Sequence, residues 1–336
     1  MLTLERMRAI RLHRRPLGQL VFANSLLMLD YRFPKPTKIV IEGLQHLPRD
    51  RTVILAMNHT DRYNYWPFQY QLYREGLPFT ATWVKGKYYE NKAMAAFMDA
   101  CNNIPLPSRG FVLSSDFRAC MGRKPSKEEY RCLRDWVDGK RAPDGENGAA
   151  PGEVTAFLAR FCAREAGDPS RAVDAAAFLA AFDRNWLRYV HEIVRLTATA
   201  LGGAGNNLLV FPEGTRSTTL GPGQVGLVAM AWHLGCDIVP VGCNGSDACY
   251  PGNSPFSRGG RIVYRVGPAL RLEGPELSPF AVPRNVLPLT RDADPYLERY
   301  RAATAVVMDR IAALLDPVYL PKPGAGPSKD GADRFM

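Results

Sequence analysis

A histidine in this chain directly follows an apolar stretch and is surrounded by polar side chains. Residues 52–64 read TVILAMNHTDRYN, with His59 at the point where the apolar stretch ends. We therefore expect His59 where a strand ends and a loop opens, a usual location for catalytic groups in α/β folds. Histidine can remove a proton from a hydroxyl when a partner fixes its tautomer. Asn58, Thr60, Asp61 and Asn64 could supply that partner, although a lone histidine is more often structural.

A second polar loop, FPEGTRS at residues 211–217, also follows an apolar run. Gly214 permits a close approach of the backbone, Thr215 offers a hydroxyl and an amide, and Arg216 offers a planar fork of donors. Together these groups predict a cradle for a phosphate monoester. Taken alone, the same residues could form a surface turn with an ion pair. In a chain that also has the His59 loop, the seven-residue string is a much more specific signal.

The elements that must position these loops alternate between short apolar strands and helices, which is typical of an α/β domain. We expect strands at 38–43, 52–59, 78–86, 102–108, 207–214, 237–244 and 261–270. Helices fit between them at 65–75, 90–100 and 224–235, and a long one fits at 183–201. The predicted fold is therefore α/β, with a central sheet of about seven strands flanked by helices.

The stretch of about 114–182 interrupts this alternation and predicts a helical insertion. It lacks strand signals and contains the polar, Gly/Pro-rich link GKRAPDGENGAAPGE at 139–153. Ser126 and Glu129 have the spacing of a capping box, and two Ala-rich helical stretches follow the link. The main domain is expected at 37–315, and the Pro/Gly-rich residues 316–336 are expected to be disordered.

The N-terminal segment, residues 1–36, combines basic residues with a short apolar helix. Its longest apolar run, LGQLVFANSLLML at 17–29, is too short for the ~20 residues that span a bilayer. Five arginines precede the run, so it could lie in a membrane interface with basic side chains on lipid phosphates. A helix docked on the protein's own core is an equally good interpretation. A secretory signal is disfavoured because DYRFPKP follows the run.

The composition of the 336 residues, 46% hydrophobic and 23% charged, is that of a folded globular protein. The formal charge of +10 favours anionic partners: nucleic acid, an acidic membrane surface or a phosphate-bearing molecule. The seven cysteines include no C-x-x-C pair and cannot all pair within the chain, so they indicate reduced thiols in a cytosol-facing protein. Cys236, Cys243 and Cys249 match no ligand spacing, and no metal site is predicted.

Five sequence blocks, taken together, resemble the motifs of the glycerolipid acyltransferase family, the lysophosphatidic acid and glycerol-3-phosphate acyltransferases. They are the His59 loop, VKGKYY at 84–89, NNIPLPSRG at 102–110, FPEGTRS at 211–217 and IVPVGCNG at 238–245. The resemblance covers about residues 38–270 outside the insertion. It implies an enzyme that moves a fatty acyl group from acyl-CoA or acyl carrier protein to a hydroxyl of a lysophospholipid or glycerol phosphate. It also implies a cytoplasmic protein that is peripherally associated with a membrane surface.

Residue by residue, the resemblance makes His59 the general base that deprotonates the acceptor hydroxyl. It assigns the acceptor's phosphate to Lys85, Arg109 and Arg216, and the shape of that pocket to Glu213, Gly214 and Thr215. Pro240 is expected near the acyl donor. No cofactor is implied beyond acyl-CoA or acyl carrier protein as co-substrate.

The chain departs from the family's His-x-x-x-x-Asp motif, because Asn64 stands where the aspartate is expected. A carboxylate would stabilise the imidazolium that forms, whereas an amide only accepts the hydrogen bond; in the serine-protease triad this exchange costs roughly 10⁴-fold. Three interpretations stay open. Asn64 orients His59 at a lower rate, Asp61 supplies the missing charge, or catalysis is lost and only lipid or acyl-CoA binding remains. An acyltransferase with an amine or another special lipid as acceptor is a further alternative.

Other patterns carry less information. GPGQVG at 221–226 fits a dinucleotide-binding string, but no strand runs into it and no acidic ribose partner follows at a suitable place. The basic chain carries no recognised nucleic-acid-binding motif, so no nucleic-acid partner is predicted.

Overall fold

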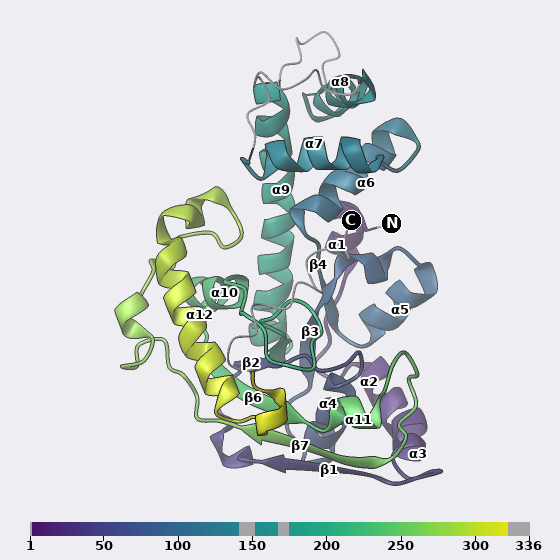
Figure 1. Cartoon of the computed structure of the whole chain (residues 1–336), viewed down its shortest axis with the longest axis vertical. Coiled ribbons are helices and arrows are strands. Elements are labelled where there is room, and N and C mark those ends of the chain that lie inside the picture. Colours follow the sequence, from purple (N-terminus) through teal and green to yellow (C-terminus); the bar gives the residue numbers. More distant parts are fainter. Residues whose placement is uncertain (1, 141–151, 167–174, 322–336) are drawn as a thin grey trace.

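The computed structural model describes residues 2–140, 152–166 and 175–321, and in these ranges a single seven-stranded sheet forms the centre of the molecule (Figure 1). The strand order is β1-β7-β6-β2-β5-β3-β4. Every neighbouring pair is parallel except β6 and β7, which are antiparallel. The strands are β1 (Thr37–Glu42), β2 (Ile54–Met57), β3 (Thr80–Lys85), β4 (Asn103–Leu106), β5 (Asn207–Val210), β6 (Ile238–Asn244) and β7 (Gly260–Val266). The predicted α/β fold and all seven strands are confirmed.

The central strands are buried on both faces, as their continuous apolar sequences indicate. Alternate residues of β2 enter two different cores: Ile54 and Ala56 pack with one cluster, Leu55 and Met57 with the other. The first cluster includes residues of α9 (Ala175–Ala198), α10 (Gly226–Leu234) and α12 (Leu297–Ala312). The second includes residues of α4 (Tyr65–Arg74). Helices therefore cover both faces of the sheet.

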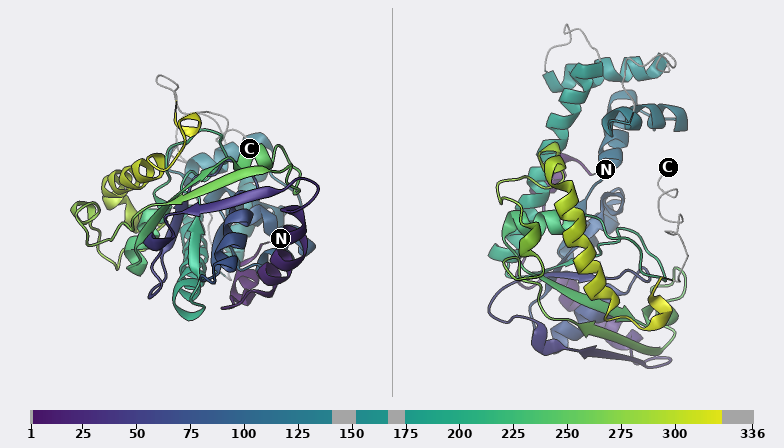
Figure 2. Two further views of the ribbon diagram at one scale, coloured as in Figure 1. Left: turned by 90° about the horizontal axis from the view of Figure 1, so that it is seen from below. Right: turned by 60° about the vertical axis from the view of Figure 1, so that its left-hand side comes forward.

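The helical insertion projects away from the sheet (Figures 1 and 2). It consists of α6 (Arg109–Met121), α7 (Lys127–Val137), α8 (Gly152–Ala166) and the far end of α9. The predicted capping box is present at the start of α7, where Ser126 and Glu129 cap each other. The insertion begins at Arg109, a few residues earlier than expected, because Ser108 caps a helix directly after β4. Most of the polar link predicted at 139–153 lies outside the described residues.

The C-terminal residues up to 321 are more ordered than the sequence predicts. Residues 317–319 form a helical turn, and the buried Tyr319 hydroxyl donates to Asp247 Oδ1 at 2.6 Å. The amide of Leu220 donates to the Tyr319 carbonyl at 2.8 Å. The prediction of disorder from residue 316 is thus wrong for residues 316–321, because one aromatic side chain anchors this stretch. Residues 322–336 lie outside the described ranges.

The N-terminal segment forms α1 (Leu4–Ala9), α2 (Leu17–Phe22) and α3 (Met28–Asp30), with a π-helical turn between the last two. The buried Gln19 amide donates to the main-chain oxygens of Thr80 and Cys101, both at 2.7 Å. The other face of α2 exposes Leu17 (73%) and Val21 (65%). The helix is therefore docked on the protein's core and still presents an apolar outer face. Among the described residues, no helix has the length and apolar character needed to cross a membrane.

Candidate active site

The two polar loops singled out in the sequence lie side by side. The His59 loop follows β2 and FPEGTRS follows β5, and these strands are parallel neighbours whose carboxyl ends share one edge of the sheet. The main-chain N–H of Ser217 donates to the carbonyl of His59 at 2.9 Å. The imidazole of His59 stacks on Phe211, with 3.9 Å between ring centroids and 16° between planes. The two loops therefore form one site.

Asn64 fixes the orientation and the tautomer of His59. The side-chain amide of Asn64 is fully buried, and its Nδ2 donates to the main-chain oxygen of Asn58 at 2.8 Å. A carbonyl only accepts hydrogen bonds, so the Oδ1 atom of Asn64 must be the one that faces His59 Nδ1, at 3.1 Å. Nδ1 consequently carries the proton. The lone pair of His59 lies on Nε2, where a base needs it.

The surroundings keep His59 neutral. Burial lowers the pKa of His59 to about 3, the hydrogen bond with Asn64 opposes that shift, and the charges of Arg216 and Lys85 lower the pKa further. A neutral imidazole can accept a proton throughout the physiological range. The same cations make the imidazolium that results from proton transfer unfavourable.

Asp61 is turned towards its own loop and does not pair with His59 in this arrangement. Its Oδ1 accepts the amide of Tyr63 at 2.7 Å, and its Oδ2 accepts the hydroxyl of Thr60 at 3.0 Å. Burial raises the pKa of Asp61. The structure thus pairs the histidine with Asn64 and not with the alternative carboxylate.

Glu213 connects three loops through its carboxylate. Its Oε1 accepts the main-chain N–H of His59 at 2.8 Å, and its Oε2 accepts that of Gly221 at 2.8 Å. Burial raises the pKa of Glu213 to about 7, against the two backbone hydrogen bonds, which lower it. Gly214 follows with φ of +67°, a left-handed conformation that favours glycine. Glu213 and Gly214 therefore shape the FPEGTRS turn.

A cavity of about 850 Å³ opens beside His59. Part of its lining is apolar and comes from α4, β3, α5 (Lys92–Ala100) and β4: Trp66, Val84, Met94, Phe97, Met98 and Leu106. Another part is cationic: Arg62, Lys85, Lys87 and Arg216. Two carboxylates, Asp61 and Asp247, also line it. One cavity thus offers both an apolar arm and a positively charged region next to His59.

The cationic region contains two predicted residues and two that sequence reasoning missed. Lys85 and Arg216 were expected, and burial, followed by the charges of Lys87 and Arg216, lowers the pKa of Lys85 to about 8. Arg62 and Lys87 are additional members. Arg62 lies within the string TVILAMNHTDRYN, and Lys87 lies within VKGKYY. Their positive charge, so close to the predicted site residues, could have identified them as part of the cationic region. Thr215 also lines the cavity, as expected.

Arg109 is not brought into this site, although it was expected to bind the acceptor's phosphate. Its guanidinium donates to Asp183 Oδ1 at 2.7 Å and to the carbonyl of Val137 at 3.1 Å. It also lies over the rings of Phe182 and Trp186. Because α6 begins at this residue, the side chain is held within the helical insertion.

Pro240 was expected near the acyl donor. It lies inside β6, where it is paired with Ala56, and it does not line the cavity.

Comparisons with known proteins find similarity to acyltransferases in one part of the chain. The family model described as Acyltransferase matches residues 177–244, which include β5, the FPEGTRS loop and β6. Among solved structures, the chain is similar to the 1-acyl-sn-glycerophosphate (LPA) acyltransferase PlsC from Thermotoga maritima, with 14% identity and a TM-score of 0.38. That similarity covers 91% of this chain and 86% of the other. No curated protein gave a sequence match. Over residues 177–244, the family model agrees with the acyltransferase family predicted from the motifs.

Proposed function

We propose that the chain transfers a fatty acyl group from an acyl-CoA or acyl carrier protein thioester to a hydroxyl of a lysophospholipid or glycerol phosphate. The observation that carries this proposal is the cavity beside His59, where an apolar arm and a cationic region meet at one base. An acyl chain suits the apolar arm, and a phosphate suits the cations. The transferred carbonyl and the acceptor hydroxyl then meet at the imidazole.

In this proposal His59 acts as a general base without a covalent acyl-enzyme. Nε2 takes the proton of the acceptor hydroxyl as the oxygen attacks the thioester carbon. The tetrahedral intermediate collapses, the carbon–sulfur bond breaks, and the imidazolium returns its proton to the leaving thiolate. Asn64 keeps Nδ1 as the donor and so keeps Nε2 available in both steps.

The acceptor's phosphate is assigned to Lys85 and Arg216, with Arg62 and Lys87 extending the same charged region. Arg109 is left out of this assignment because Asp183 already binds its guanidinium. Glu213 positions His59 through the main chain, so its role is to hold the loop in place.

A membrane surface is the proposed location, on its cytoplasmic side. The outer faces of the N-terminal helices and the turn after them expose large apolar side chains, Leu17, Val21, Leu29 and Phe33. Exposed basic side chains lie in the same segment, at Arg14, Arg15, Arg32 and Lys35. Apolar side chains flanked by positive charge suit the interface of an anionic bilayer.

The test is acyl transfer from labelled acyl-CoA, and in parallel from acyl carrier protein, to a panel of glycerol phosphate, lysophospholipids and amines. The His59→Ala variant removes the base, and the His191→Ala variant is the matched control because His191 is exposed on α9. Product that disappears with His59→Ala and persists with His191→Ala supports the proposal and identifies the acceptor. Product that persists with His59→Ala contradicts the assigned base. If acyl-CoA binds but no acceptor is acylated, the chain is a binding protein.

A further inference from the structure

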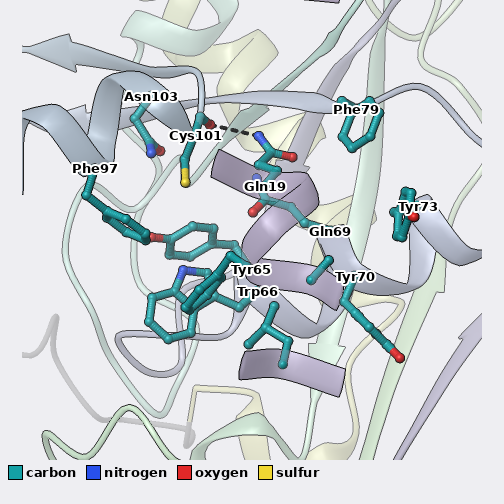
Figure 3. Close-up of a pocket in the computed structure, with 13 residues that line it drawn as sticks. Gln19, Tyr65, Trp66, Gln69, Tyr70, Tyr73, Phe79, Phe97, Cys101 and Asn103 are labelled. Carbon is teal, nitrogen blue, oxygen red and sulfur yellow. Dashed lines mark hydrogen bonds between the residues drawn. The ribbon is translucent and has the colours of Figure 1, made fainter. Parts of the chain in front are cut away.

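Two carboxylates line the cavity beside His59, and the proposed reaction leaves both of them unused. Asp61 and Asp247 line the same space as the four cations described above. A smaller pocket of about 20 Å³ next to α2, by contrast, is lined only by uncharged side chains, most of them aromatic (Figure 3). The negative charge therefore calls for an explanation within the substrate cavity.

The two carboxylates lie near each other because they follow neighbouring strands. Asp61 follows β2, and Asp247 follows β6 in the short helix α11 (Ser246–Cys249). Burial raises the pKa of Asp61, and the charge of Asp247 adds to that shift. Within residues 2–140, 152–166 and 175–321, neither carboxylate forms a salt bridge. A positively charged ligand between them would relieve their repulsion.

Asp247 is held in place and still has an oxygen available for a ligand. Its Oδ1 accepts the hydroxyl of Tyr319 at 2.6 Å, and that hydroxyl in turn accepts the N–H of Gly245 at 2.8 Å. Its Oδ2 accepts no hydrogen bond from the part of the chain that the structure describes. The carboxylate is therefore oriented by one oxygen and can bind through the other.

A buried hydroxyl without a partner lies beside the two carboxylates. Ser246 directly precedes Asp247, and its hydroxyl is close enough to Asp61 to oppose the effect of burial on the pKa of that carboxyl. The same hydroxyl is fully buried and makes no hydrogen bond of good geometry with any described residue. Buried polar groups in native proteins are nearly always paired. The three side chains together thus offer negative charge and open hydrogen-bonding capacity to a ligand.

An ammonium group fits these features better than a metal ion does. Among the described residues, no group of three or more His, Cys, Asp or Glu side chains could hold a metal ion. An ammonium instead donates its N–H groups to carboxylate and hydroxyl oxygens. Two residues after Asp61 and three after Asp247 stand Tyr63 and Tyr250, whose rings line the cavity with 5.6 Å between centroids. Aromatic rings also attract ammonium groups.

We propose that Asp247, with Asp61 and Ser246 beside it, selects an acceptor whose head group carries an ammonium in addition to its phosphate. The acyl donor cannot supply this group, because coenzyme A and the arm of acyl carrier protein present phosphates, amides and a thioester there. Arg62 directly follows Asp61 and lines the cavity, so the phosphate of the same acceptor can lie beside its ammonium. The inference rests on the proposed function, because it needs an acceptor that binds in this cavity.

The test is the preference between two acceptors that differ only in the ammonium. They are a short-chain, water-soluble lysophosphatidylethanolamine and its N-acetyl derivative, which keeps the phosphate and loses the positive charge. In the wild type, kcat/KM should be higher for the free amine by about tenfold or more, since a hydrogen bond to a charged group is worth at least that much. Asp247→Asn should abolish the preference, because it keeps an oxygen for the Tyr319 hydroxyl but removes the charge.

Two control variants separate charge from structure. Tyr319→Phe removes the hydrogen bond to Asp247 but leaves its charge, so the preference for the free amine should persist. Asp292→Asn makes the same change of charge at an exposed position that does not line the cavity, and it should leave the preference unchanged. Thermal unfolding of all variants identifies any loss of folding.

The affinity of both acceptors in a His59→Ala background, which needs no turnover, separates this inference from the proposed function. Tighter binding of the free amine that Asp247→Asn abolishes, without turnover by the wild type, keeps the inference and rejects the proposed reaction. Turnover that depends on His59 but is equal for both acceptors keeps the reaction and overturns the inference. A folded Asp247→Asn variant that retains the preference also overturns it. A preference that requires added Mg²⁺ and disappears with a chelator would assign the carboxylates to a metal ion and overturn it as well.

Discussion

Replacing Asn64 by aspartate would restore the family's motif, yet the structure predicts a loss of stability rather than a better enzyme. The amide of Asn64 is fully buried and uses both of its ends, donating to Asn58 and accepting from His59. An ionised aspartate accepts hydrogen bonds only. Its second oxygen would face the carbonyl oxygen of Asn58 across the 2.8 Å that the amide bond now spans.

The expected loss in the free energy of unfolding follows from the lost hydrogen bond to Asn58. Losing the bond and leaving a buried acceptor unsatisfied costs about 3 kcal/mol. The protonated form of the introduced carboxyl avoids most of this cost, because its O–H donates to Asn58 as the amide does. Burial therefore raises the pKa of that carboxyl above its ordinary value. The carboxyl therefore has a higher pKa in the folded protein than in the unfolded chain. Its contribution to the free energy of unfolding is fully present below the unfolded-state pKa and is lost as pH rises through the folded-state pKa.

The assay is urea unfolding of the wild type and Asn64→Asp at about pH 5 and about pH 8, both above the ordinary pKa of an aspartate carboxyl. We expect a deficit of about 1.5 kcal/mol at the lower pH, where the unfolded chain has already released the proton that the folded chain keeps, and a deficit of about 3 kcal/mol at the higher pH. Asn24→Asp, a matched change at an exposed position, should show little difference at either pH.

Activity provides the second half of this test. At about pH 6 the protonated carboxyl of the Asn64→Asp variant offers His59 the same acceptor as the amide, so the rate should stay within about threefold of the wild type. A variant that is fully stable at pH 8 and faster by a factor approaching ~10⁴ would refute the reasoning. It would mean that the main chain near Asn58 adapts to a carboxylate.

Three further predictions concern charge. Burial raises the pKa of Glu213 from 4.5 to about 7, so wild-type stability should fall as pH rises through that window, and Glu213→Gln should remove this part of the pH dependence in urea unfolding. The pKa of Lys85 is lowered to about 8, so kcat/KM for a phosphate-bearing acceptor should decline above that pH, and Lys85→Arg should move the decline upward in a pH–rate profile. Leu17→Asp with Val21→Asp should weaken sedimentation with anionic vesicles by about tenfold or more, whereas Val318→Asp, at a position 73% exposed like Leu17, should not.

The fold could be predicted well because parallel strands covered on both faces have continuous apolar sequences. The residues of β2 and β6 show this, since each strand is buried along its whole length and ends at a polar loop. The predicted strand ends differ from the observed ones by a few residues at most, whereas the long helix predicted at 183–201 already begins at Ala175. What the sequence could not reveal is that β5 lies next to β2, which comes far earlier in the chain. The two polar loops lie side by side only because β2 and β5 are adjacent strands.

The composition of the site was harder to predict than the fold. Motif position suggested Arg109 as a phosphate ligand, but Asp183, far along the chain on α9, pairs with it. Nothing local to Arg109 indicates that partner. Side chains that act through distant partners cannot be assigned from sequence spacing alone.

The charges around His59 indicate how binding and proton transfer could be linked. Lys85 and Arg216 lower the pKa of His59, which favours neutral imidazole but opposes the imidazolium formed during the reaction. The ring's Nδ1 faces the amide of Asn64, which carries no charge to offset those cations. In the proposed reaction the acceptor's phosphate supplies the missing negative charge by binding the same two side chains. The acceptor would then both deliver the hydroxyl and strengthen the base that deprotonates it, so the cost of having an amide at Asn64 should be smallest for acceptors that carry a phosphate.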